Sequence, residues 1–130
     1  MLSTKKSIVR QYCDAVGRGD IEAYRSFVTE DFTHEFLGST VLAGKRSLPE
    51  AIERVQGFSA ALAGDAKFVF QEMVEEGDLV AGFFTGECEL ADGRRFDGDY
   101  ALICRFKGDR IQSTRELLDT KLADTLLGDG

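Results

Sequence analysis

Apolar residues recur along the first third of the chain with the three- and four-residue spacing of amphipathic helices. The spacing predicts a helix over residues 3–17 that ends at Gly17-Arg18-Gly19, with the apolar side Ile8, Val9, Tyr12, Cys13 and Val16. Asp20 is a typical N-cap residue, so a short second helix is expected to follow it. The apolar side of that second helix is Ile21, Tyr24, Phe27 and Val28.

A strand and a third helix are predicted next. Residues 32–36 alternate between apolar and polar side chains, except that His34 falls in phase with Phe32 and Phe36. Ser47-Leu48-Pro49-Glu50 has the spacing of a capping box with proline in the first turn, and it opens a helix that runs to about Leu62. The buried stripe of this helix is Ala51, Ile52, Val55, Phe58 and Leu62.

From Lys67 onward the apolar period changes to two, which is the period of strands. Four strands are expected at about residues 67–75, 79–90, 96–107 and 110–118. Their connections have the length and composition of hairpin turns: Glu76-Gly77-Asp78, Ala91-Asp92-Gly93 and Lys107-Gly108-Asp109. Residues 120–127 are compatible with a final helical turn, and residues 128–130 should fray.

Helices followed by an antiparallel meander predict an α+β fold, with three N-terminal helices packed on one face of a curved, mostly antiparallel sheet. The chain has 130 residues and no repeat or linker, so we expect one domain over residues 1–130.

The formal net charge is −7, with acidic residues scattered along the chain. Such a field repels phosphate, which argues against nucleic acid and against an anionic membrane surface as partners. No apolar run approaches the roughly 20 residues of a spanning helix, and the N-terminus lacks the apolar block of a signal peptide. The ten phenylalanines and three tyrosines suit an apolar cavity.

The three cysteines, Cys13, Cys88 and Cys104, are odd in number and widely spaced. This pattern indicates buried thiols in a reducing cytoplasm. A zinc site would need all three thiols to converge with His34, the only histidine, so no metal is expected.

Three local features carry a resemblance to a known superfamily. They are Tyr12 seven residues before Gly19-Asp20, the segment Glu30-Asp31-Phe32, and Arg105-Phe106-Lys107-Gly108-Asp109-Arg110-Ile111 before the last strand. With the order of elements, they resemble the nuclear transport factor 2-like superfamily. This cone-shaped fold is shared by ketosteroid isomerases, limonene epoxide hydrolases and SnoaL-like polyketide cyclases, and it hosts many activities and some non-enzymes.

The resemblance implies which residues of each strand face the inside of the cone. That set is Phe32, His34, Phe36, Val80, Gly82, Phe84, Gly86, Tyr100, Leu102, Cys104, Thr114, Glu116 and Leu118. It is mostly apolar, as a pocket for a small apolar molecule requires. The opposite phase gives the outer face Leu79, Ala81, Phe83, Ala101, Ile103, Arg105, Arg115 and Leu117. Family members usually dimerise through this face, so a homodimer is expected.

Matching catalytic positions narrows the reaction that the resemblance implies. Tyr12 matches the tyrosine that donates to the substrate oxyanion in ketosteroid isomerases, but the two aspartates of that family fall on Phe36 and Leu102. The arginine and first aspartate of the epoxide hydrolases fall on Phe84 and Gly86. SnoaL-like cyclases use a single pocket carboxylate on the last strand, without a cofactor, and Glu116 matches that place.

Each candidate residue has a functional and a structural interpretation. Glu116 could act as general acid and base, could belong to a structural polar cluster with Tyr12 or His34, or could turn toward the mouth of the cone and water. Tyr12 and His34 could donate to a ligand and orient Glu116, or could be core residues with satisfied hydrogen bonds. Gly82 and Gly86 could enlarge the cavity beside Phe84, mark bends of the sheet, or do both.

Two hypotheses about function follow. In the first, the protein is a cofactor-free isomerase, cyclase or lyase that acts on a small apolar carbonyl compound, with Glu116 moving the proton. In the second, it is a ligand-binding or dimerisation module without chemistry, which the apolar Phe36, Phe84 and Leu102 favour.

Overall fold

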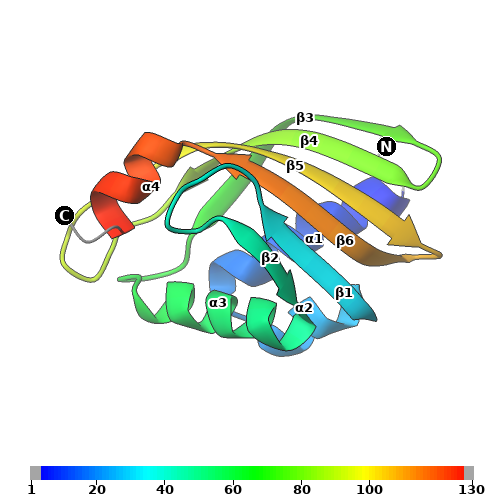
Figure 1. Ribbon diagram of the computed structural model, residues 1–130, viewed down its shortest axis with the longest axis horizontal. Coiled ribbons are helices and arrows are strands. Elements are labelled where there is room, and N and C mark those ends of the chain that lie inside the picture. The colour runs from blue at the N-terminus through cyan, green and yellow to red at the C-terminus, as the bar shows by residue number, and fades with distance from the viewer. Residues whose placement is uncertain (1–3, 128–130) are drawn as a thin grey trace.

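The computed structural model describes residues 4–127 and has four helices and six strands over that range (Figure 1). In chain order they are α1 (Thr4–Arg18), α2 (Ile21–Ser26), β1 (Val28–Phe36), β2 (Gly44–Ser47), α3 (Leu48–Ala60), β3 (Lys67–Glu76), β4 (Leu79–Glu87), β5 (Gly98–Lys107), β6 (Arg110–Leu118) and α4 (Thr120–Leu127). The α+β fold class is confirmed. The fraying expected of residues 128–130 lies outside the described residues.

The six strands form one mixed sheet in the order β2-β1-β6-β5-β4-β3. Only the β1–β6 pair is parallel, and it places Phe36 opposite Glu116. The sheet arches over α1, α2 and α3, which lie together on its concave side, while α4 lies beyond one end of β6 (Figure 1). The concave face and the three helices therefore enclose the core.

The predicted helix starts are confirmed by their capping contacts. The Asp20 carboxylate accepts a hydrogen bond from the backbone N–H of Ala23 at 3.1 Å. The Glu50 carboxylate accepts one from the backbone N–H of Ser47 at 3.0 Å. Each contact satisfies a backbone donor that a helix start would otherwise leave unpaired.

Three features differ from the sequence prediction, and strand pairing explains the first two. Val28 belongs to β1 and not to the second helix, because it pairs with Ile111 of β6. β2 was not predicted, since its sequence is polar and carries no apolar alternation, but it pairs along β1. Residues 120–127 form a full helix, so the described residues contain a fourth helix besides the three expected.

The connection between β4 and β5 is also longer than the predicted hairpin. β4 ends at Glu87 and β5 begins at Gly98, so Leu90 and Phe96 lie outside the strands that were expected to contain them. The backbone N–H of Ala91 donates to the carbonyl of Ala61 at 2.8 Å. The connection is therefore tied to the end of α3. Its two arms still pair as a hairpin around the predicted turn, with an antiparallel bridge between Glu89 and Arg95 and a hydrogen bond from the N–H of Leu90 to the carbonyl of Arg94 at 2.7 Å.

The predicted strand phase is confirmed by burial. Along β5, Tyr100, Leu102 and Cys104 are buried, and the residues between them are exposed. On β6, Thr114 is buried and Arg115 is exposed. The concave face of the sheet is therefore the inner face that the family resemblance implied.

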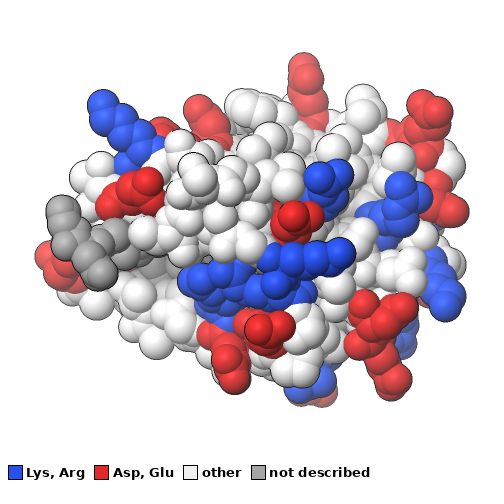
Figure 2. All heavy atoms as spheres, in the orientation of Figure 1, with Lys and Arg blue, Asp and Glu red and all other residues white. Residues whose placement is uncertain are grey.

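Charged side chains are spread over the surface, and lysines and arginines gather over β2 and α3 on the face shown in Figure 2. Among residues 4–127, no helix is long and apolar enough to cross a membrane.

Candidate functional site

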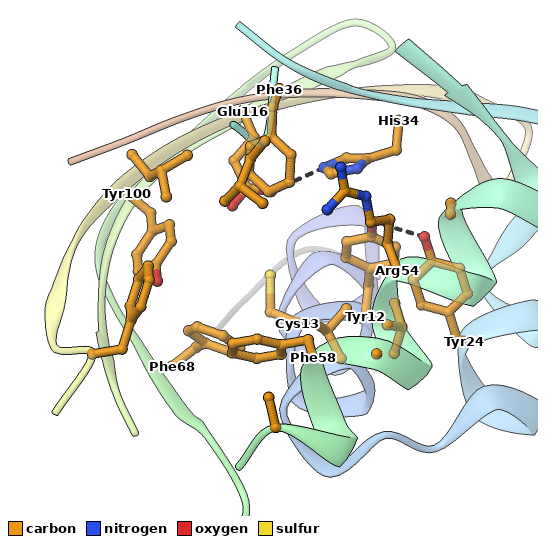
Figure 3. Close-up of a pocket in the computed structure, with 18 of the residues that line it drawn as sticks. Tyr12, Cys13, Tyr24, His34, Phe36, Arg54, Phe58, Phe68, Tyr100 and Glu116 are labelled. Atoms are coloured by element: carbon orange, nitrogen blue, oxygen red, sulfur yellow. Dashed lines mark hydrogen bonds and ion pairs between the residues drawn. The ribbon is translucent and has the colours of Figure 1, made fainter. Parts of the chain in front are cut away.

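A cavity of about 410 Å³ lies between the concave face of the sheet and the helices (Figure 3). Its lining is mainly apolar and aromatic, and it opens to solvent beside exposed residues of α3 and of the β1–β2 loop. The lining residues are Tyr12, Cys13, Val16, Tyr24, His34, Phe36, Val41, Leu42, Ala51, Glu53, Arg54, Val55, Gly57, Phe58, Ala61, Phe68, Phe84, Leu90, Phe96, Tyr100, Glu116 and Leu118.

Glu116 and His34 form a hydrogen-bonded pair at this cavity. The Oε1 atom of Glu116 lies 3.1 Å from Nε2 of His34, and their side chains are only 14% and 10% exposed. The parallel pairing of β1 and β6 brings the two residues together, although they are 82 positions apart. The Phe36 ring lies edge-on to the imidazole, with centroids 4.6 Å apart, and restricts its movement.

Tyr12 does not bond to Glu116. Its hydroxyl lies 3.3 Å from the hydroxyl of Tyr24, which the sequence pattern assigned only to the apolar side of the second helix. Burial raises the pKa of both hydroxyls, and the charge of Glu116 raises each further. Both tyrosines therefore stay protonated near neutral pH. Because one hydroxyl donates to the other, one proton of the pair remains available to a ligand oxygen.

The predicted site residues divide into two groups. Seven line the cavity: Tyr12, His34, Phe36, Phe84, Tyr100, Glu116 and Leu118. The others lie on the concave face of the sheet but outside the lining: Phe32, Val80, Gly82, Gly86, Leu102, Cys104 and Thr114. Those with large side chains fill the core; Phe32, for example, packs its ring against Tyr12 and Tyr24.

The two glycines make room for aromatic rings and not for an empty cavity. A Cβ atom at Gly82 would lie 2.7 Å from the ring of Phe70, and one at Gly86 would lie 2.7 Å from the ring of Tyr100. The irregularity in the β3–β4 pairing falls on β3, between Phe70 and Glu72. The interpretation that the glycines enlarge the cavity is therefore wrong, because rings already occupy the space.

Several lining residues were not identified from the sequence. Phe58 was recognised as part of the buried stripe of α3, and Phe68 lies on the first of the four predicted strands, so periodicity could have found both. Arg54, Val41 and Leu42 carry no such signal, because they come from an exposed helix position and an irregular loop.

The three cysteines are buried free thiols, as the sequence indicated. Burial raises the pKa of Cys13, and the neighbouring Cys104 and Glu116 raise it further. Within residues 4–127, no group of three or more histidine, cysteine or acidic side chains is placed to hold a metal ion.

Residues 9–114 match the model of the SnoaL-like domain. The chain therefore belongs to the SnoaL-like domain family, a class of the nuclear transport factor 2-like fold that the sequence resembled. No curated protein matches the chain.

Solved structures show the same fold over nearly the whole chain. A nuclear transport factor 2-like protein of unknown function from Burkholderia pseudomallei is 18% identical with a TM-score of 0.82, covering 98% of this chain and 100% of its own. A proposed polyketide cyclase from Acidithiobacillus ferrooxidans is 21% identical with a TM-score of 0.77, covering 98% and 96%. IdmH, a proposed polyketide cyclase from Streptomyces antibioticus, is 19% identical with a TM-score of 0.78, covering 98% and 100%.

Proposed function

We propose that the protein binds a small apolar carbonyl compound of polyketide type in this cavity and moves a proton on it. The reaction would be an isomerisation, cyclisation or elimination that needs no cofactor. The observation that carries the proposal is a single carboxylate, Glu116, held by His34 at the wall of an apolar, aromatic cavity. The proposed polyketide cyclases among the structural neighbours support the substrate class.

In this reaction, Glu116 takes a proton from the carbon next to the ligand carbonyl. The electrons of the broken C–H bond form the carbon–carbon double bond of an enolate, and the negative charge moves to the carbonyl oxygen. Glu116 then returns the proton to another carbon, or the enolate carbon attacks a second carbonyl of the same ligand and Glu116 gives the proton to the alkoxide that this attack forms.

The two other polar groups have supporting roles. His34 Nε2 donates to Glu116 Oε1 when that nitrogen is protonated, which fixes the direction of the carboxylate. The free proton of the Tyr12–Tyr24 pair donates to the enolate oxygen, where charge develops. The cavity thus offers a base on the sheet side and a hydrogen-bond donor on the helix side.

Proton exchange on a simple ketone tests the proposal without knowledge of the natural substrate. In deuterated buffer, we expect the protein to accelerate hydrogen–deuterium exchange at the carbon beside the carbonyl of 1-indanone, followed by proton NMR. Glu116→Gln should reduce the accelerated rate by about 10²–10⁴-fold, the usual contribution of a general base.

Glu35→Gln is the matched control. Glu35 neighbours Phe36 on β1 but turns to the other face, where it lies 3.4 Å from Arg115. This variant should exchange at the wild-type rate. Equal rates in wild type and Glu116→Gln would remove the catalytic proposal.

A second candidate function is ligand binding without chemistry. It is favoured by Phe36 and Leu102, which stand where ketosteroid isomerases carry acids; Leu102 is only 2% exposed. The same experiment separates the two functions. Saturable binding of 1-indanone without accelerated exchange would select the binding module.

A further inference from the structure

Among the residues that the structure describes, one arginine at the cavity lacks a partner. Arg54 lines the cavity from the exposed side of α3, and its side chain extends toward the part that holds His34 and Glu116 (Figure 3). Among residues 4–127, Arg54 forms no ion pair or hydrogen bond. Glu116 is bonded to His34 instead. A guanidinium has five N–H donors, and those of Arg54 remain open to a ligand.

A second arginine, Arg46, adds positive charge near Arg54 at the entrance of the cavity. Arg46 on β2 donates to the carbonyl oxygens of Leu42, Ala43 and Gly44 at 3.0, 3.4 and 3.2 Å, so its guanidinium is fixed in place. Burial lowers the pKa of Arg46, and the positive charge of Arg54 lowers it further. The two guanidinium groups therefore repel each other at this entrance, where lysines and arginines gather in Figure 2.

The nearby acids offset this repulsion only in part, because the charge of Glu50 raises the pKa of Arg46 by less than burial and Arg54 lower it. Glu50 accepts hydrogen bonds from the backbone and hydroxyl of Ser47 at the start of α3. Glu53 lines the cavity but forms no ion pair with either arginine. The protein as a whole carries a net charge of −7, so an anionic ligand meets a generally repulsive field. Arg54 and Arg46 supply local attraction at the entrance of the cavity.

We infer that the ligand is an amphiphilic acid, whose aromatic or apolar body fills the cavity and whose anionic oxygen group binds Arg54. The body would lie among Phe58, Phe68 and Tyr100, which form apolar walls. The anionic group anchors the ligand at the entrance and directs its inner carbon atoms toward Glu116. Arg54 is in this role a specificity-determining residue, because it selects acids over neutral compounds of the same shape.

The inference rests on the proposed function for the apolar part of the ligand, and it can be tested by binding alone. The probes are 2-naphthoic acid, which is an anion at neutral pH, and 2-naphthamide, which is neutral and has nearly the same shape. Isothermal titration calorimetry on the full chain gives a dissociation constant for each. We expect the wild type to bind naphthoate about tenfold more tightly than naphthamide, as one charge-assisted interaction allows.

Variants assign this preference to one side chain. Arg54→Gln should weaken naphthoate about tenfold and leave naphthamide unchanged, while Arg54→Lys should keep part of the preference because it keeps the charge. Arg25→Gln removes the same charge from an exposed position on α2 that does not line the cavity, so it should keep the full preference. Added salt should reduce the preference of the wild type.

Three results would overturn the inference. They are equal binding of acid and amide by the wild type, an equal effect of Arg54→Gln and Arg25→Gln, and no binding of either compound at roughly millimolar concentration. The outcome is separate from that of the exchange experiment. If Arg54 selects the acid but Glu116→Gln leaves the hydrogen–deuterium exchange rate unchanged, the proposed ligand class is retained and the proposed catalytic step is rejected.

Discussion

At the scale of single residues, Cys13 has access to the cavity but a weakly reactive thiol. It lines the cavity, and burial, Cys104 and Glu116 all raise its pKa. Burial followed by the charge of Glu116 also raises the pKa of Cys104. Burial, followed by the charge of Asp97, raises the pKa of Cys88. The reactive species is the thiolate, so each shift lowers reactivity near neutral pH.

We therefore predict slow modification of the folded protein by Ellman's reagent. At about pH 8, the folded protein should react more than about tenfold more slowly than a free thiol, and the unfolded protein should release three equivalents quickly. Glu116→Gln should speed the reaction of Cys13, because it removes one charge that opposes the thiolate. A Cys13→Ala variant identifies the contribution of this thiol. A thiol of the folded wild type that reacts at the free rate would contradict the prediction.

The sequence predicted the position of Glu116 but did not settle which residue is its hydrogen-bond partner. Glu116 was predictable as an inward-facing acid, because strand alternation and the family resemblance both set its phase. Its partner was left open between Tyr12 and His34, because side-chain hydrogen bonds depend on register between distant strands. In the structure, His34 is the hydrogen-bond partner of Glu116, and Tyr24 is the hydrogen-bond partner of Tyr12.

At the scale of elements, β4 shows how a strand makes room for rings. Phe68 packs edge-on to both Phe84 and Tyr100, at 5.7 Å from each, and Phe84 and Tyr100 stack 5.0 Å apart with an interplanar angle of 8°. A Cβ atom at Gly86 would meet Tyr100 at 2.7 Å and Phe68 at 2.9 Å. The three rings pack against one another, so none of them can move away from an added Cβ atom at low cost.

Gly86→Ala is therefore expected to destabilise the protein by about 1–3 kcal/mol, the usual cost of overpacking a core. Urea unfolding followed by circular dichroism gives the free energy. Gly57→Ala is the matched control, since Gly57 lies in α3 and the added Cβ would meet no described atom within 4 Å beyond its chain neighbours and the backbone of its own helix. That variant should gain about 0.4–1 kcal/mol. A Gly86→Ala protein as stable as the wild type would show that the rings can shift.

The elements with strong local patterns were predictable, and those formed by pairing were not. α1 and α3 have apolar stripes, α2 and α3 begin at capping residues, and β3 to β6 alternate clearly, so each was found within a few residues. β2 reads Gly-Lys-Arg-Ser and becomes a strand only because β1 offers it hydrogen bonds. Arg46, which is held beside the cavity, sits on this strand and was missed for the same reason.

At the scale of the whole molecule, the outer face of the sheet carries an apolar strip. Its large side chains remain 42–48% exposed: Val69, Phe83, Ile103 and Leu117. They come from four adjacent strands, and pairing joins Phe83 through Ala101 to Leu117. An apolar surface of this extent on a small domain favours contact with another protein surface.

We propose that a second copy of the chain covers this face, as the family resemblance led us to expect. In a two-fold dimer the same patch meets itself, so one substitution changes both sides of the contact. Ile103→Lys places a charge in the middle of the strip and should convert a dimer into a monomer. Analytical ultracentrifugation measures the mass of both forms. Gln56→Lys adds the same charge to an exposed position of α3 and should leave the dimer intact. A wild type that sediments as a monomer at micromolar concentration would contradict the proposal.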